Sequence, residues 1–458
     1  MEMGDAIRDI TTSYFFRGEK FLEYFNTKEF VKTVKDNFKI VNEDITDVSK
    51  LYRYIFEEKP HLKKEVDELF FEQVLYSNLK NVYVNTFDEE VSIQTLEKRM
   101  KQVLTEVNMK NPIPPQYYPS MKESGFNLME KMYITEPGAK FIVAYDYKET
   151  ESKLTNCRIL FVESIRDKNN KARYFLSGID INFKEKFYLI MIRNIADSID
   201  KSNNQGNNIS NTQEEKIEVD TTTLQLYNRV QKDVVSKIVG NIEEINPSVD
   251  RKALYYLCEK LDTALLGDIR KTVNSKIRKH VEQNIESTFS ELFKQDIMPG
   301  PDEKKELADN MESLLVASYI KAFYGDRPKK IAAKAKGLGL PGYSTKFTFK
   351  GNRANKGSTQ SSNSKEPVSA TDMFHSLYIS FKGSMNLENL GISWFEDFNQ
   401  TNKKNTHVVQ TVAYSQANQF RVVFKPRRDL NKELIYHVIR QLNEQRRHQA
   451  KKEQRRNL

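Results

Sequence analysis

Four segments between residues 126 and 200 constrain the fold of this chain more than any other feature. They read KFIVAYDY, CRILFVESI, ARYFLSGIDI and KFYLIMIR, and they are rich in β-branched and aromatic residues, as strands are. The intervening pieces DKNNK and NFKE have the composition of turns. Because short turns join antiparallel neighbours, we expect a four-stranded antiparallel meander, covered on one face by the helices predicted before it.

Helical periodicity dominates the chain before and after this stretch. The first 110 residues are predicted to be mainly helical, since apolar side chains such as Val66 and Phe70 recur at helical spacing. From Ile269 to Leu292 an apolar residue recurs nearly every four positions, which predicts one long buried stripe or two helices in series. Pro247 should begin a helix, and MPGPDEKK should end one helix and begin the next.

The C-terminal part is predicted to combine strands with one helix. LYISFKG, HVVQTVAYS and QFRVVFKP are typical of strands, and LNKELIYHVIRQLNEQ is typical of a helix. Beyond Leu442 the apolar stripe stops, so the basic end of this helix is expected to project or fray. An α+β fold follows: a helical N-terminal part on an antiparallel meander, a central helical domain, and a small C-terminal β-rich domain ending in a basic helix.

Composition shifts divide the chain into five predicted parts. SNNQGNNISNTQEEK is rich in Asn and lacks apolar periodicity, so it is interpreted as a linker. The parts are a helical and antiparallel-sheet domain over 1–200, the Asn-rich linker over 201–219, a central helical domain over 220–325, a basic Gly/Ser-rich arm over 326–372, and a C-terminal β-rich domain with a basic tail helix over 373–458.

Positive charge is concentrated in the last third of the chain. Residues 327–356 hold nine Lys and Arg and no Asp or Glu, and residues 425–458 hold eleven against four. These two segments carry +16, so the rest of a chain whose net charge is +9 carries −7. Such asymmetry predicts a polyanionic partner, because cations that neutralise phosphates release counterions. The alternative is that both segments are solvated and only aid solubility.

The candidate site residues come from these segments and from nearby aromatic residues. KFTFKG and YISFKG are predicted to be two strands that present lysines and rings together; alternatively, their rings face a core and their lysines face water. Phe347, Phe349 and Trp394 are the expected stacking partners for bases. The residues expected to contact phosphate are Arg327, Lys329, Lys330, Lys334, Lys336, Lys346, Lys350, Arg353, Lys356, Arg427, Arg428, Arg446 and Arg447.

Other chemistries are weaker alternatives. LLGDIRKTVNSKIRKHV, with a helix over residues 250–264 before it, offers a helix-turn-helix, although the apolar stripe explains this helix without one. Asp146, Glu163 and Asp180 lie in or beside the meander and offer a metal-dependent nuclease site. GLGLPGY lacks the P-loop pattern. The six histidines are scattered, and the two cysteines, Cys157 and Cys258, are predicted to be buried thiols. We therefore expect no metal, no cofactor and no enzymatic activity.

These observations favour a non-catalytic nucleic-acid-binding protein. We expect an accessory or promoter-recognition subunit of a transcription or replication machine, which binds DNA rather than RNA and has protein partners. A structural or interaction protein of a phage particle or defence assembly is the alternative, and the richness in Asn, Lys and Ile is similar to that of chains from AT-rich phage and mobile-element genomes. We expect a cytoplasmic protein without a membrane partner, because no apolar run reaches the length of a membrane span and MEMGDAIRDI is no secretion signal.

Overall fold

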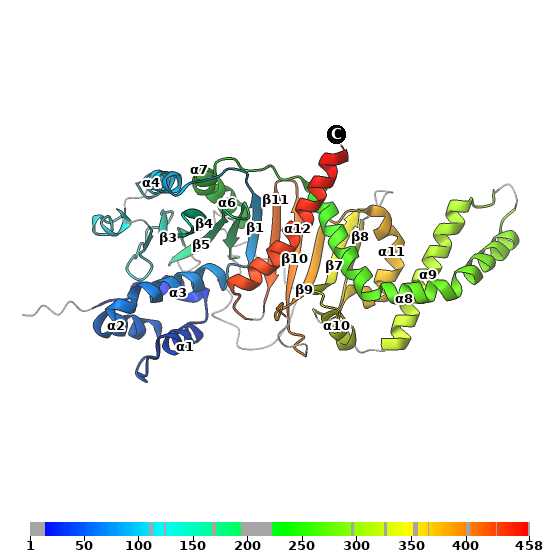
Figure 1. Ribbon diagram of the computed structural model, residues 1–458, viewed down its shortest axis with the longest axis horizontal. Coiled ribbons are helices and arrows are strands. Elements are labelled where there is room, and N and C mark those ends of the chain that lie inside the picture. Colours follow the sequence, from blue (N-terminus) through cyan, green and yellow to red (C-terminus); the bar gives the residue numbers. More distant parts are fainter. Residues whose placement is uncertain are drawn as a thin grey trace, which may run out of the picture. The chain divides into compact units, whose positions relative to one another are not determined.

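The chain folds into two compact units. The computed structural model describes residues 14–109, 113–122, 125–166, 171–193, 222–294, 297–324, 328–350, 356–364, 366–399, 404–426 and 428–456. The first unit consists of the described residues up to Ile242, except for the short strand Asn81–Asn85. The second unit consists of that strand and the described residues from Glu243 onward. Helices and antiparallel strands occur in both units, so the predicted α+β class is confirmed (Figure 1).

An antiparallel sheet forms the centre of the first unit. Its strands run in the order β2 (Phe126–Asn127), β3 (Lys140–Thr150), β4 (Lys153–Arg166), β5 (Ala172–Asn182) and β6 (Phe187–Ile192). The last four follow one another in sequence and pair antiparallel, so the predicted meander is confirmed. The β3–β4 turn contains Glu151 and Ser152, which both have positive φ, as expected for a tight hairpin turn.

Helices cover both faces of this sheet. The described helices of this unit include η1 (Glu19–Tyr24), α1 (Thr27–Phe38), α2 (Val48–Glu58), α3 (Lys63–Tyr76), α4 (Ile93–Met109), α6 (Thr223–Val230), the π-helix η6 (Gln231–Val235) and α7 (Ser236–Val239). α3 packs on β5, where Gly178 permits a close approach because a Cβ there would lie 2.7 Å from Leu75 Cδ1. α4 contacts β3, and α6 contacts β5 and β6. Glu163 and Arg158 of β4 are five positions apart, so their side chains point to opposite faces of the sheet. Glu163 contacts α6 and Arg158 contacts α3, so α6 lies on the face opposite α3. The preceding helices α3 and α4 thus contact different faces of the sheet, whereas they were predicted to cover one face together.

The second unit contains a six-stranded antiparallel sheet. Its order is β1 (Asn81–Thr86), β11 (Gln419–Lys425), β10 (Val408–Gln416), β9 (Asn389–Phe395), β7 (Gly342–Lys350) and β8 (Lys356–Gln360). β1 comes from the N-terminal part of the chain and pairs with β11, with Asn81 opposite Val423. The unit is thus assembled from segments more than 300 positions apart.

Five α-helices and the short 3-10 helix η8 (Val368–Ala370) are described beside this sheet. The α-helices are α8 (Pro247–Leu292), α9 (Pro301–Tyr324), α10 (Pro328–Gly337), α11 (Asp372–Ser384) and α12 (Lys432–Arg456). α8 begins at a proline, and the Asn246 side chain accepts the free backbone N–H groups of Ser248 and Val249, which is a favourable start for a helix. α8 contacts α9, α12 and strands β7, β9 and β10. The predicted helix starts at Pro247 and within MPGPDEKK are confirmed, but α8 ends at Leu292, six positions before MPGPDEKK, and not within it as predicted.

Two predictions and one alternative considered for this region are wrong. α8 runs without a break from Pro247 to Leu292, so it has no turn between residues 250–264 and the basic segment, and the helix-turn-helix considered as an alternative does not form. YISFKG lies in helix α11 and not in a strand. The described part of the predicted arm, 326–372, is folded into α10, β7 and β8.

The predicted domain boundaries also differ from the observed units. The helices predicted as a central domain over 220–325 are divided, because α6 and α7 belong to the first unit while α8 and α9 belong to the second. The reason is tertiary packing, which helical periodicity does not reveal. The predicted linker, 201–219, lies outside the described residues.

Candidate nucleic-acid interface

Helix α12 carries the basic C-terminal segment and is held along its length by the second unit. Leu434, Val438 and Leu442 are buried on its inner side. Beyond Leu442 the helix continues to Arg456, where polar contacts with α8 replace the apolar ones. These contacts join Arg446 Nε to Asp250 Oδ1 at 2.7 Å and Lys252 Nζ to Glu453 Oε1 at 2.6 Å. The prediction that this end has nothing to pack against is therefore wrong.

The outer face of α12 is cationic. Arg440, Arg447, Lys451 and Arg455 are exposed and recur at intervals of seven, four and four residues, so they lie along one face of the helix. The exposed Glu444 lies on the same face between Arg440 and Arg447. Lys452 and Arg456 are also exposed. Between residues 445 and 456 the only acidic residue is Glu453, whose carboxylate contacts Lys252. This end of the helix therefore presents five exposed cations to solvent without an exposed carboxylate between them.

The cations of the other predicted basic segment are mostly paired within the unit. The pairs are Lys334 with Asp268 at 3.0 Å, Lys336 with Asp397 at 3.3 Å, and Lys350 and Lys356 with Glu388 at 3.7 and 2.8 Å. Lys356 lowers the pKa of Glu388, as expected for an ion pair formed in the folded chain. Arg428 contacts Glu396 in the same way. Asp and Glu residues that are distant in sequence thus neutralise cations of a segment that itself contains no Asp or Glu.

The remaining predicted basic residues are scattered. Lys330 is exposed on α10, and Lys346 is half-buried on β7. Arg446 points inward to Asp250, whereas Arg447 lies on the outer face of α12. Arg327, Arg353, Arg427 and the side chain of Lys329 lie outside the described residues. The two predicted segments therefore contribute one described cationic stripe, on α12, and not one shared groove.

The aromatic residues predicted to stack on bases are core residues. Phe347 and Trp394 have 0% exposure and Phe349 has 2%. The Phe347 ring centroid lies 5.0 Å from that of Phe381 on α11, and Trp394 Nε1 donates to Thr411 Oγ1 at 2.7 Å. The prediction of a stacking surface is wrong for these three rings. Phe347 and Phe349 pack against Phe381 of α11, part of which was expected to be a strand, and Trp394 packs against His437 of α12.

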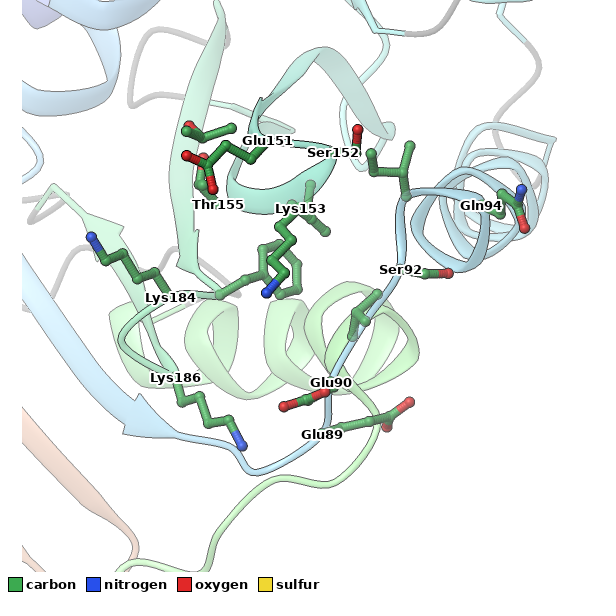
Figure 2. Close-up of a pocket in the computed structure, with 15 residues that line it drawn as sticks. Glu89, Glu90, Ser92, Gln94, Glu151, Ser152, Lys153, Thr155, Lys184 and Lys186 are labelled. Atoms are coloured by element: carbon green, nitrogen blue, oxygen red, sulfur yellow. The ribbon is translucent and has the colours of Figure 1, made fainter.

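A cavity of the first unit has both signs of charge on its walls. It has a volume of about 1040 Å³ and lies between the loop before α4, the β3–β4 turn and the β5–β6 turn. Figure 2 shows Lys184 and Lys186 on the left, Lys153 reaching into the middle, and Glu89 and Glu90 beneath Lys153. Lys186 Nζ lies 2.8 Å from Asp88, and Arg99 lies 2.5 Å from Glu89. These contacts stabilise the surrounding loops.

The acids considered for a nuclease are bound to groups of the same chain. The guanidinium of Arg158, only 1% exposed, donates from Nε to Asp146 at 2.9 Å and from Nη1 to Glu72 at 2.8 Å. Asp180 accepts from Tyr76 and Asn156. Glu163, on the other face, pairs with Arg229. Among the described residues no group of His, Cys, Asp and Glu is placed to hold a metal ion.

Both cysteines are buried and free, as predicted, and burial raises the pKa of the Cys258 thiol to about 12. Of the helices described, none combines the length and the apolar character needed to cross a membrane. Comparison of the chain with protein-family models, with curated proteins and with solved structures finds no match.

Proposed function

We propose that this chain is a non-catalytic nucleic-acid-binding protein that contacts phosphates through the outer face of α12. The observation that carries the proposal is the run of exposed cations from Arg447 to Arg456 without an exposed carboxylate. Such a stripe attracts a polyanion because neutralising phosphates releases condensed counterions. Of the residues proposed from the sequence, Arg447 belongs to this stripe.

The dimensions of the stripe suit an extended polyanion. Arg447 and Arg456 are nine positions apart, which corresponds to about 13.5 Å along a helix. Duplex DNA presents about 8 phosphate charges over that length, at one per 1.7 Å of its axis. Several of the cations can therefore reach phosphates at once when the helix lies along the duplex.

The Lys and Arg side chains of the stripe favour contacts that position the protein on nucleic acid over contacts that distinguish its bases. Lys and Arg contacts to phosphate fix the register of a protein on nucleic acid without reporting bases. With the aromatic candidates buried, we propose backbone contact to duplex DNA as the main mode and single-strand stacking as the lesser one. A non-catalytic subunit of a transcription or replication complex would use such contacts to hold a template.

A titration of nucleic-acid binding at several salt concentrations tests the proposal. We would measure fluorescence anisotropy of duplex DNA, single-stranded DNA and RNA with the full chain and with two variants that each lose four positive charges. The stripe variant replaces Arg447, Lys451, Arg455 and Arg456 with Gln, and the matched control replaces the paired cations Lys334, Lys350, Lys356 and Arg428 with Gln.

The two variants have the same net charge, so they separate a site from a general charge effect. The stripe variant should lower the slope of log affinity against log salt on duplex DNA by roughly 0.9 for each phosphate that it no longer neutralises. The control should keep most of the slope because carboxylates of the same unit already neutralise its cations. Absence of binding at low salt, or an equal decrease of the slope in both variants, would contradict the proposal.

A structural or interaction protein remains the second candidate. The apolar side chains exposed on α9 favour it, because contiguous apolar surface marks protein contacts. A large assembly that forms without nucleic acid, detected by light scattering, would support this candidate over the first.

A further inference from the structure

The strands of the second unit place their cations on one face of the sheet. Residue pairing through β9 and β10 sets Lys346 of β7 in line with Val423 of β11. Arg421 and Lys425 lie two positions on either side of Val423, so they share the face of Lys346. Lys350, four positions from Lys346, also lies on this face, together with Lys356, which is opposite it on β8. The Lys and Arg residues of the six strands are thus all on one side: Lys346, Lys350, Lys356, Arg421 and Lys425.

Helices pack against the other face of the same sheet. Phe347, beside Lys346 in β7, packs against α11. Phe420, beside Arg421 in β11, packs against α12, which Figure 1 shows running across these strands. We call the face that carries the cations the outer sheet face. α10 covers the end of it that contains Phe395.

The outer sheet face carries little negative charge. The six strands contain no Asp or Glu, although these residues make up 63 of the 458 in the chain. Glu388, directly before β9, pairs with Lys356 at 2.8 Å and with Lys350 at 3.7 Å. In the part of the chain that the structure describes, Lys346, Arg421 and Lys425 make no ion pair. These three cations therefore keep their charge available to a partner.

Arg421 is held between two tyrosine rings. Its guanidinium carbon lies 5.2 Å from the ring centroid of Tyr414 and 6.0 Å from that of Tyr83. Its Nε is buried, and no described residue accepts a hydrogen bond from it. Buried donors are normally paired, so this N–H suits an acceptor from outside the chain. A stacked guanidinium presents its donors in a fixed plane, which matches the oxygens of a phosphate.

The cations and the Tyr414 ring are spread over a surface that an extended chain can cross. Lys346 lies three strand spacings from β11, or about 14 Å, and Arg421 and Lys425 are about 13 Å apart along β11. The Tyr414 ring is half-exposed between them on β10. A polyanion on this face therefore meets separate positive charges and one aromatic ring.

We propose that the outer sheet face binds a single strand of nucleic acid, with Lys346, Arg421 and Lys425 on its phosphates and Tyr414 against a base. This inference rests on the proposed nucleic-acid binding and adds a second site with its own class of ligand. A duplex keeps the faces of its bases stacked inside, whereas a single strand offers them to a ring.

The composition of the face argues against a protein partner. None of the large apolar side chains exposed in the described chain belongs to these six strands, and protein–protein interfaces have an apolar centre. The cations of α12 lie on its outer face, and α12 itself packs on the opposite side of the sheet. The two sites can therefore be substituted independently.

Fluorescence anisotropy of a labelled oligothymidine and of a labelled duplex, each with the full chain, tests the proposal. The face variant is Lys346→Gln with Lys425→Gln. It should lower the salt slope on the single strand by up to about 1.4, at roughly 0.7 for each phosphate, and change duplex affinity less than twofold. The matched control, Lys271→Gln with Lys305→Gln, removes two exposed lysines of α8 and α9 and should leave both ligands unaffected.

Substitution of the ring tests the stacking contact. Tyr414→Leu should weaken binding of the single strand by about tenfold, while Tyr414→Phe keeps the ring and should bind like the unsubstituted chain. Thermal melts of both variants check the fold, since a purely structural ring would change the melting temperature without changing the preference for a single strand. Equal affinities of the Leu and Phe variants would overturn the stacking contact.

Failure of this inference is distinguishable from failure of the proposed function. If the stripe variant of α12 loses both ligands while the face variant keeps both, the outer sheet face is no binding site and the proposed function stands. If neither ligand binds the full chain at low salt, both proposals fail. Polyglutamate that competes as well as oligothymidine at equal charge would indicate a surface for acidic protein segments and would also overturn the inference.

Discussion

Arg446, in the basic C-terminal helix, donates from Nε to Oδ1 of Asp250 on α8 at 2.7 Å. The two side chains are 11% and 3% exposed, and the guanidinium also lies 4.2 Å from the ring centroid of Phe420. A residue whose charge suggests phosphate binding thus fastens α12 to α8. Its neighbour Arg447 points to solvent, so one step along the helix separates a structural cation from a candidate binding cation.

This contrast gives a stability prediction. Arg446→Ala leaves the buried Asp250 carboxylate without its partner and should lower the free energy of unfolding by about 3 kcal/mol, since removing one member of a buried pair is costly. Arg447→Ala, at an exposed position, should change it by roughly 0.5 kcal/mol or less. Urea denaturation followed by circular dichroism measures both, and similar effects for the two variants would contradict this assignment.

The ionic cluster of the meander gives a second prediction. Arg158→Met removes the donor shared by Asp146 and Glu72 and should destabilise the first unit by about 3 kcal/mol. Adding Asp146→Asn should recover part of this stability because it removes one of the two stranded charges. If the double variant is less stable than Arg158→Met, the cluster does not act as an ion pair.

Asp67 predicts a pH dependence for the first unit. It is buried beside Glu130, and Lys63 contacts both carboxylates at 2.5 and 2.8 Å. Burial and the charge of Glu130 raise the pKa of Asp67 to about 6, against the opposing effect of Lys63. Between about pH 4 and 6 the folded chain therefore keeps a proton that the unfolded chain has released.

The stability contributed by protonated Asp67 consequently decreases as pH rises through this window. Asp67→Asn should remove that slope. Urea midpoints of the first unit at pH 4, 5, 6 and 7 measure the effect, and an unchanged slope in Asp67→Asn would assign it to another group.

His375 predicts the opposite sign for the second unit. Its Nε2 lies 2.9 Å from the carbonyl oxygen of Ser369, and burial together with the charge of Arg270 lowers the pKa of the ring to about 4. Between about pH 6.5 and 4 the unfolded chain binds a proton that the folded chain excludes, so stability should fall as pH falls. His375→Gln should flatten this dependence, as measured by thermal melts across the same window; a slope that survives the substitution would count against it.

The elements that could be predicted from the sequence are those with a strong local signal. The meander follows from alternating apolar runs with polar turns between them, and α8 follows from its periodicity and its Asn-Pro start. α11 was missed because YISFKG resembles an alternating strand. Thr371, whose hydroxyl accepts the Phe374 N–H, and the spacing of Phe374, Tyr378 and Phe381 were the helical signals available.

The candidate site was less predictable because its ion pairs join residues that are distant in sequence. Nothing near Lys356 in sequence indicates that Glu388 will neutralise it, and nothing near Lys334 indicates Asp268. Likewise, the direction in which Arg446 and Arg447 point depends on where α8 lies. Local charge density therefore located the basic segments, but only the fold separates paired cations from exposed ones.

Strand β1 has a consequence for how this protein is made. Residues 81–86 leave the ribosome long before Gln419–Lys425, the strand with which they pair. During synthesis β1 cannot pair with β11 until more than 300 further residues have been added. A recombinant fragment that starts at Glu243 would carry β11 as a bare sheet edge, which is a recognised route to aggregation. Any dissection of this molecule should therefore supply residues 81–86 in trans or graft them beside β11.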